Sequence, residues 1–152
     1  MKKKLILLLV LLLLILASLS LCIGEEKDDN KKEKKVELPK IKRFEFIDVG
    51  KGYDENDPDN YQAAVEVHVD FLNIDKSLKI IAKAKYDGNE SQDEYEEPDP
   101  GGSTGLMLGL YIYVPSKDTI PEQFTVIVFY DGQEIDRKVY NDLKPGDFVE
   151  EP

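Results

Sequence analysis

The sequence predicts an all-β protein, an antiparallel β-sandwich that follows an N-terminal hydrophobic signal or anchor helix. Two observations lead to this prediction. After residue 40, apolar residues recur with strand-like spacing in six segments, and no stretch shows the 3.6-residue period of an amphipathic helix. Turn-forming residues separate these segments, and a domain of about 110 residues is large enough to bury one core between two sheets.

The first three segments show the alternation expected of half-buried strands. In residues 41–49, the apolar phase breaks between Phe46 and Ile47, which predicts a β-bulge. Residues 61–73 and 78–86 alternate cleanly, with apolar side chains on one face and charged side chains on the other. We therefore expect each of these strands to cover one side of a core.

The last three segments differ in character. Residues 106–114 are apolar on both faces, so we expect a strand that is covered on both sides. Residues 124–130 are β-branched and aromatic, which favours a strand. The tight-turn pair Asp131-Gly132 follows, and residues 135–140 are the expected return strand of a hairpin.

The span from Phe124 to Asp147 resembles the end of CARDB-type and related immunoglobulin-like extracellular modules. Those modules carry a strand, an Asp-Gly turn, a return strand and a Leu-x-Pro-Gly corner before a final strand. Here Asp131-Gly132 matches the turn, and Leu143-Lys144-Pro145-Gly146 matches the corner. Only residues 148–152 follow the corner, so the final strand is very short or missing. The resemblance implies an immunoglobulin-like, non-enzymatic surface domain used in adhesion, scaffolding or display.

The N-terminus, residues 1–21, has the layout of a signal peptide or membrane anchor. Lys2, Lys3 and Lys4 precede a run from Leu5 to Leu21 that only two serines interrupt. The positive end stays cytoplasmic, so the rest of the chain is expected outside, at the extracytoplasmic face of the cell membrane.

Cys22 ends the apolar run, and Leu19-Ser20-Leu21-Cys22 resembles a lipoprotein lipobox. The resemblance implies that Cys22 is lipidated and becomes the mature N-terminus. Leu21 departs from the pattern, which has a small residue directly before the cysteine. An uncleaved transmembrane helix is therefore the alternative, because an apolar helix of this length can just cross a bilayer core of about 30 Å.

Residues 22–40 are expected to form a charged, flexible linker, and residues 41–152 the β-sandwich domain. The stretch from Glu25 to Lys40 contains few apolar side chains, so it cannot bury enough surface to offset the entropy of its chain.

Two acidic loops are candidates for binding. Asp54, Glu55, Asp57 and Asp59 crowd the first loop, and calcium takes about six to eight oxygen ligands. The spacing does not fit an EF-hand, and the composition favours a solvated, turn-rich loop over a weak calcium site. Residues 87–104 form the second, whose like charges predict mobility unless a cation or a basic partner gathers them.

Two further residues are candidate sites. Asn89 begins the N-glycosylation sequon Asn89-Glu90-Ser91, a pattern that also arises by chance. His68 shares one strand face with Glu66 and Asp70, but alternate residues lie about 6.6–6.8 Å apart, too far for one ion without help from another strand. A surface histidine among charges is the favoured interpretation.

The amino-acid composition excludes several classes of function. The 152 residues carry a net charge of −11, which opposes nucleic-acid binding, and the single Cys and single His remove most catalytic and metal-binding constellations. We expect no cofactor and no enzymatic activity. The leading hypothesis is an exported, membrane-anchored binding, adhesion or structural module with a protein partner at the cell surface. An ancillary extracytoplasmic subunit of a transport or secretion complex, and an enzyme with paired carboxylates, are the alternatives.

Overall fold

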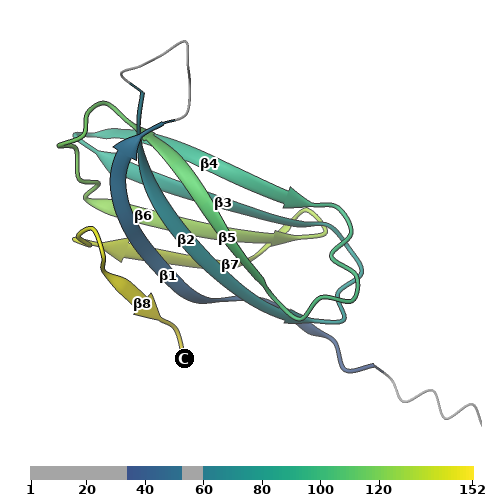
Figure 1. Ribbon diagram of the computed structural model, residues 1–152. Helices are drawn as coiled ribbons and strands as arrows, with labels where there is room; N and C mark the ends of the chain where they lie inside the picture. Colours follow the sequence, from purple (N-terminus) through teal and green to yellow (C-terminus); the bar gives the residue numbers. More distant parts are fainter. Residues whose placement is uncertain (1–33, 53–59) are drawn as a thin grey trace, which may run out of the picture. The chain divides into compact units, whose positions relative to one another are not determined.

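The computed structural model describes residues 34–52 and 60–152, of which residues 35–152 form one compact unit. The strands are β1 (Glu37–Lys51), β2 (Tyr61–Leu72), β3 (Leu78–Tyr86), β4 (Asn89–Glu97), β5 (Leu106–Val114), β6 (Gln123–Tyr130), β7 (Gln133–Asn141) and β8 (Phe148–Glu150). They form two four-stranded sheets: sheet A has the order β5-β2-β1-β8, and sheet B has the order β4-β3-β6-β7. Figure 1 shows the two sheets as separate layers.

Every strand pair in both sheets is antiparallel. The expected all-β, two-sheet antiparallel architecture is therefore confirmed, and it is compatible with an immunoglobulin-like sandwich. In the part of the chain that the structure describes, no helix is long and apolar enough to cross a membrane. The hydrophobic segment 1–21 lies outside the described residues.

The core lies between the sheets and is built from alternate, inward-facing side chains, as the alternation in β2 and β3 predicts. An aromatic cluster joins the two layers. Phe44 and Phe46 of β1 lie 5.3 and 4.8 Å from Phe124 of β6, measured between ring centroids, and Tyr140 of β7 stacks on Phe44 at 4.5 Å. Burying one such side chain contributes about 1.5–3 kcal/mol, so the cluster holds sheet A on sheet B.

Tyr140 carries the one polar side-chain group of this aromatic cluster. Its hydroxyl is buried and lies near the Glu151 carboxylate, but it makes no hydrogen bond of normal geometry with any described residue, and that carboxylate accepts from Lys138 at 2.9 Å. Burial raises the pKa of the phenol far above its ordinary value, and the nearby Glu151 carboxylate raises it further. The group is therefore held neutral in the folded protein.

Strand β1 differs from the prediction at its start and agrees with it in the middle. The register with β2 shifts between Phe46 and Asp48, which confirms the predicted bulge. The strand begins at Glu37, inside the segment 22–40 that we predicted to be linker. Pairing with β2 explains this difference, because Glu37 lies opposite Leu72 in the β1–β2 register. The very short final strand is also observed, since β8 has three residues and pairs with β1.

The prediction of a mobile loop at residues 87–104 is wrong for half of this segment, because residues 89–97 form β4, an edge strand of sheet B. Asp87 and Gly88 have φ values of 47° and 76°, as in the two-residue turns that favour hairpins, so β3 turns directly into β4. Lysines on β3 then neutralise glutamates on β4. The Nζ atoms of Lys79 and Lys83 lie 2.8 Å from carboxylate oxygens of Glu94 and Glu90, respectively.

Strand β5 also corrects a prediction. Its inward-facing residues are buried, but the other face is open to solvent. Met107 is 64% exposed, Tyr111 59% and Tyr113 48%. We expected cover on both sides because both faces are apolar. The strand is in fact at the edge of sheet A, and no described element covers its outer face.

Candidate interaction surface

The predicted site residues fall into two groups. Cys22 and the acidic residues Asp54, Glu55, Asp57 and Asp59 lie outside the described residues. Asn89 is described: it is the first residue of β4 and is exposed, and its side-chain amide donates to the carbonyl of Asp87 at 3.3 Å. The described residues contain no group of three or more His, Cys, Asp or Glu that could hold a metal ion.

Strand β5 presents a cluster of exposed apolar side chains on the outer face of sheet A. Met107, Tyr111 and Tyr113 of β5 point outward, together with Gly109. The β2–β5 register places Gly109 opposite Glu66, and Tyr111 opposite Ala64. We call Met107, Gly109, Tyr111, Tyr113 and Ala64 the tyrosine face.

Two small residues shape the tyrosine face. A Cβ atom on Gly109 would lie 3.7 Å from the hydroxyl of Tyr111, so the ring of Tyr111 folds back along the strand over Gly109. Ala64 beside it adds only a methyl group. The ring of Tyr111 is therefore supported from below and remains open to solvent above, which suits packing against a partner.

Charged residues of β1 and β2 flank the tyrosine face. Arg43 donates to Glu45 at 2.6 Å, and the His68 ring nitrogen Nε2 lies 2.8 Å from Glu66. Arg43 lies opposite His68, and Glu45 lies opposite Glu66, so acid faces acid across the strands while each hydrogen-bonded pair runs along its own strand. The row of Glu66, His68 and Asp70 that the sequence predicts is present, with His68 bonded to Glu66 rather than arranged around an ion.

Two carboxylates beside these pairs have no ion-pair partner in the described part of the chain. Asp48 lies opposite the uncharged Ala64 in the β1–β2 register, whereas Asp70, two residues beyond His68 on β2, lies opposite Lys40; both acids are exposed. Asp70 also lines a shallow hollow of about 320 Å³, with His68, Thr104, Gly105, Leu106 and Met107. The outer face of sheet A therefore combines exposed aromatic rings with one carboxylate, that of Asp48, that has no cationic neighbour across the strands.

The free edge of β5 is partly blocked by β4. The Asp93 carboxylate accepts a hydrogen bond from the backbone N–H of Tyr111 at 2.9 Å, and the Ser91 hydroxyl donates to the carbonyl of Tyr113. These side chains hydrogen-bond to backbone groups of β5 with which an added strand would have to pair. A partner that binds here would therefore contact the face of β5 rather than extend the sheet.

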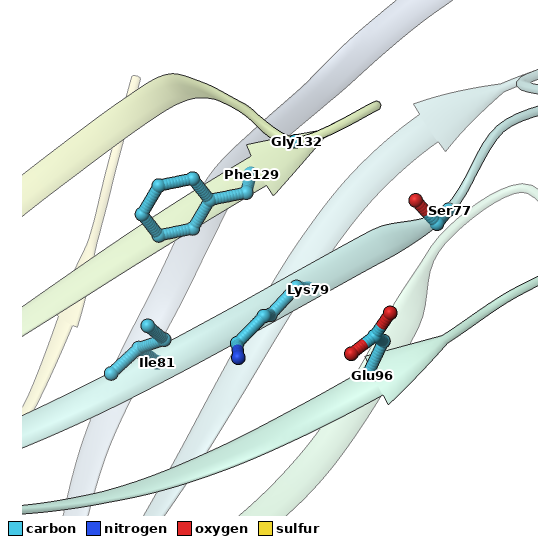
Figure 2. A pocket seen from close by; sticks show the side chains of 6 residues that line it. All are labelled: Ser77, Lys79, Ile81, Glu96, Phe129 and Gly132. Atoms are coloured by element: carbon cyan, nitrogen blue, oxygen red, sulfur yellow. The ribbon is translucent and has the colours of Figure 1, made fainter.

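The outer face of sheet B offers a second, smaller hollow (Figure 2). It has a volume of about 240 Å³ and is lined by Ser77, Lys79, Ile81, Glu96, Phe129 and Gly132. Small-molecule sites usually have about 300–1,000 Å³, so this hollow is smaller than a typical ligand site. Lys79 is already paired with Glu94, and this contact raises the pKa of the ammonium group. We regard this hollow as a weaker candidate than the tyrosine face.

No family model, no curated protein and no solved structure matches this chain. The function must therefore be argued from the surface itself. The apolar composition of residues 106–114 predicted a strand covered on both sides, so Met107, Tyr111 and Tyr113 were not among the predicted site residues. A sequence signal for the open face is the glycine at position 109, which shares the outward positions of residues 106–114 with Met107, Tyr111 and Tyr113.

Proposed function

We propose that the protein is an exported, membrane-anchored and non-catalytic surface protein whose sandwich domain binds a protein partner through the tyrosine face. The observation that carries this proposal is the exposure of Met107, Tyr111 and Tyr113 on one strand face of a strongly acidic chain. Exposed apolar clusters with a polar rim are typical of interaction sites on soluble domains. An immunoglobulin-like module of the CARDB type is the family that this proposal implies.

The N-terminal sequence supports the location. Residues 1–21 have the pattern of an export signal, and Cys22 follows them directly. We propose lipidation of Cys22, with a retained transmembrane helix as the alternative. Both place the sandwich at the extracytoplasmic face of the cell membrane on a charged tether. The mass of the mature N-terminus distinguishes them, since lipidation removes residues 1–21 and adds a diacylglycerol group to Cys22.

Photo-crosslinking in native membranes tests the binding proposal. A photoreactive amino acid at position 113 should crosslink to one defined partner, and the charged variant Tyr111→Glu should abolish that crosslink. The same amino acid at position 139 is the matched control, because Val139 is an equally exposed apolar residue on sheet B, 48% against 48% for Tyr113. Equal crosslinking from both positions, or no effect of Tyr111→Glu, would contradict the proposal.

A further inference from the structure

We propose that the tyrosine face recognises a basic, extended protein segment, with lysine or arginine side chains packed on Tyr111 and Tyr113 and paired with Asp48. This inference rests on the proposed function, since it names the class of partner that the same surface binds. It depends on three features of the described residues, namely the exposed rings, the unpaired carboxylate of Asp48 and the blocked edge of β5.

The Tyr111 ring and the Asp48 carboxylate are close enough to act on one segment. Tyr111 of β5 and Asp48 of β1 both lie opposite Ala64 of β2, so only one small side chain separates them on the outer face. Adjacent strands are about 4.8 Å apart, which places the two positions about 10 Å apart across the sheet. The stem of a lysine or arginine spans most of that distance and can lie over Ala64, with its charge next to Asp48.

The chemistry of the rings favours a cation. The face of a tyrosine ring attracts an ammonium or guanidinium group, and Tyr111 presents its ring to solvent above Gly109. The protein already contains one such contact on this sheet, where the guanidinium of Arg43 lies 4.8 Å from the ring centroid of Phe148. The negative charge of Asp48 adds electrostatic attraction for the same cation.

Charge also argues against the other occupants of this surface. A second copy of the chain would bring another net charge of −11 to a face that already carries unpaired carboxylates, so self-association is opposed. A nucleic acid or an anionic lipid surface would be repelled for the same reason. A strand that extends sheet A from β5 would have to displace the contacts of Asp93 and Ser91.

Binding of a labelled peptide to the full chain in nonionic detergent micelles tests the inference. The probe is a fluorescein-labelled peptide of alternating lysine and threonine, and a glutamate–threonine peptide is its control. We expect fluorescence anisotropy to report saturable binding of the lysine peptide only, and that binding should weaken as salt is raised. Equal binding of both peptides, or no saturable binding of the lysine peptide, would overturn the inference.

Substitutions locate the binding. Tyr111→Ala and Asp48→Asn should each raise the dissociation constant about two- to fivefold, and Tyr111→Phe should leave it unchanged because the ring is kept. Glu96→Gln is the matched control, because Glu96 is an acid on the outer face of sheet B without an ion pair among the described residues. A loss of affinity in Glu96→Gln but not in Asp48→Asn would assign the peptide to sheet B and overturn the inference.

The two proposals fail separately. If position 113 crosslinks to a partner but the lysine peptide does not bind, the interaction surface stands and the basic partner is wrong. If neither occurs, the tyrosine face itself is not a binding site. Circular dichroism of each variant confirms that the β-sandwich is intact before its affinity is compared.

Discussion

The buried hydroxyl of Tyr140 gives a prediction that can be worked out in detail. Tyr140→Phe removes one oxygen atom and keeps the ring that stacks on Phe44 at 4.5 Å. The hydroxyl has no hydrogen-bond partner among the described residues, so the wild-type protein bears the cost of burying it. An unsatisfied buried polar group costs about 1–3 kcal/mol, and we expect the variant to be about 1 kcal/mol more stable than the wild type at pH 7.

The same substitution should change the alkaline limb of stability. The unfolded chain releases the Tyr140 proton near pH 10.0, whereas burial raises the pKa of this group in the folded protein. Above pH 10 the unfolded state therefore binds fewer protons than the folded state, and the free energy of unfolding falls as pH rises. One group contributes about 1.4 kcal/mol per pH unit, so the advantage of Tyr140→Phe should grow by about 1.4 kcal/mol between pH 9 and pH 11.

Urea denaturation at a series of pH values measures this difference. The quantity to compare is the free energy of unfolding of Tyr140→Phe minus that of the wild type. Val139→Ala is the control, because Val139 does not titrate and its difference from the wild type should stay constant with pH. If the difference for Tyr140→Phe is also constant from pH 9 to pH 11, the hydroxyl ionises as readily in the folded protein as in the unfolded chain, and the reasoning is refuted.

Three further predictions concern the edge, the turns and the N-terminus. Asp93→Ala should lower the free energy of unfolding in urea by about 1–2 kcal/mol because the N–H of Tyr111 loses its acceptor, whereas the exposed Glu94→Ala should cost less than about 1 kcal/mol. Gly132→Ala should lower the free energy of unfolding by about 1–2 kcal/mol through backbone strain, because Gly132 has a φ of 74° and no atom lies within 4 Å of an added Cβ. A smaller loss of stability in Gly132→Asn would support this cause, because asparagine tolerates a positive φ better than alanine does. Deleting residues 1–23 should leave a soluble domain with a β-type circular dichroism spectrum, and an insoluble or unfolded product would contradict the domain assignment.

Strands with one buried face could be predicted from sequence because their side chains record that burial. In β2, the buried residues from Ala63 to Val69 alternate with exposed or half-buried ones, and the period of two follows from the pleat. The bulge after Phe46 was predicted for the same reason, because an extra residue reverses the phase.

Strand β4 was missed because its residues are nearly all polar and show no apolar face. The charge pattern on either side of the turn nevertheless indicates its hairpin with β3. Lys79 and Lys85 precede the Asp87-Gly88 turn, and in the β3–β4 register Glu96 and Glu90 stand opposite them. This mirrored arrangement of opposite charges about a tight turn is a pairing signal that hydrophobic periodicity does not detect.

The exposed face of β5 could not be predicted from its composition. Apolar side chains at Met107 and Tyr113 are compatible with a strand that is covered on both faces. They are equally compatible with an edge strand whose outer face is an interaction surface. Strand order decides between them, and it depends on pairings between distant segments. The position of Asp48 near Tyr111 depends on the same pairings, so the candidate site appeared only with the fold.

The pairing of β8 with β1 also bears on how the domain reaches its native state. The last strand completes sheet A beside the first one, and the Lys40 ammonium donates to the carbonyl of Pro152, 112 residues away in sequence. Contacts between such distant segments give a high contact order, which slows folding because long loops must close before the contacts form. During synthesis, the edge of β1 that pairs with β8 stays open until residues 148–150 have emerged, so until then it is exposed to mispairing.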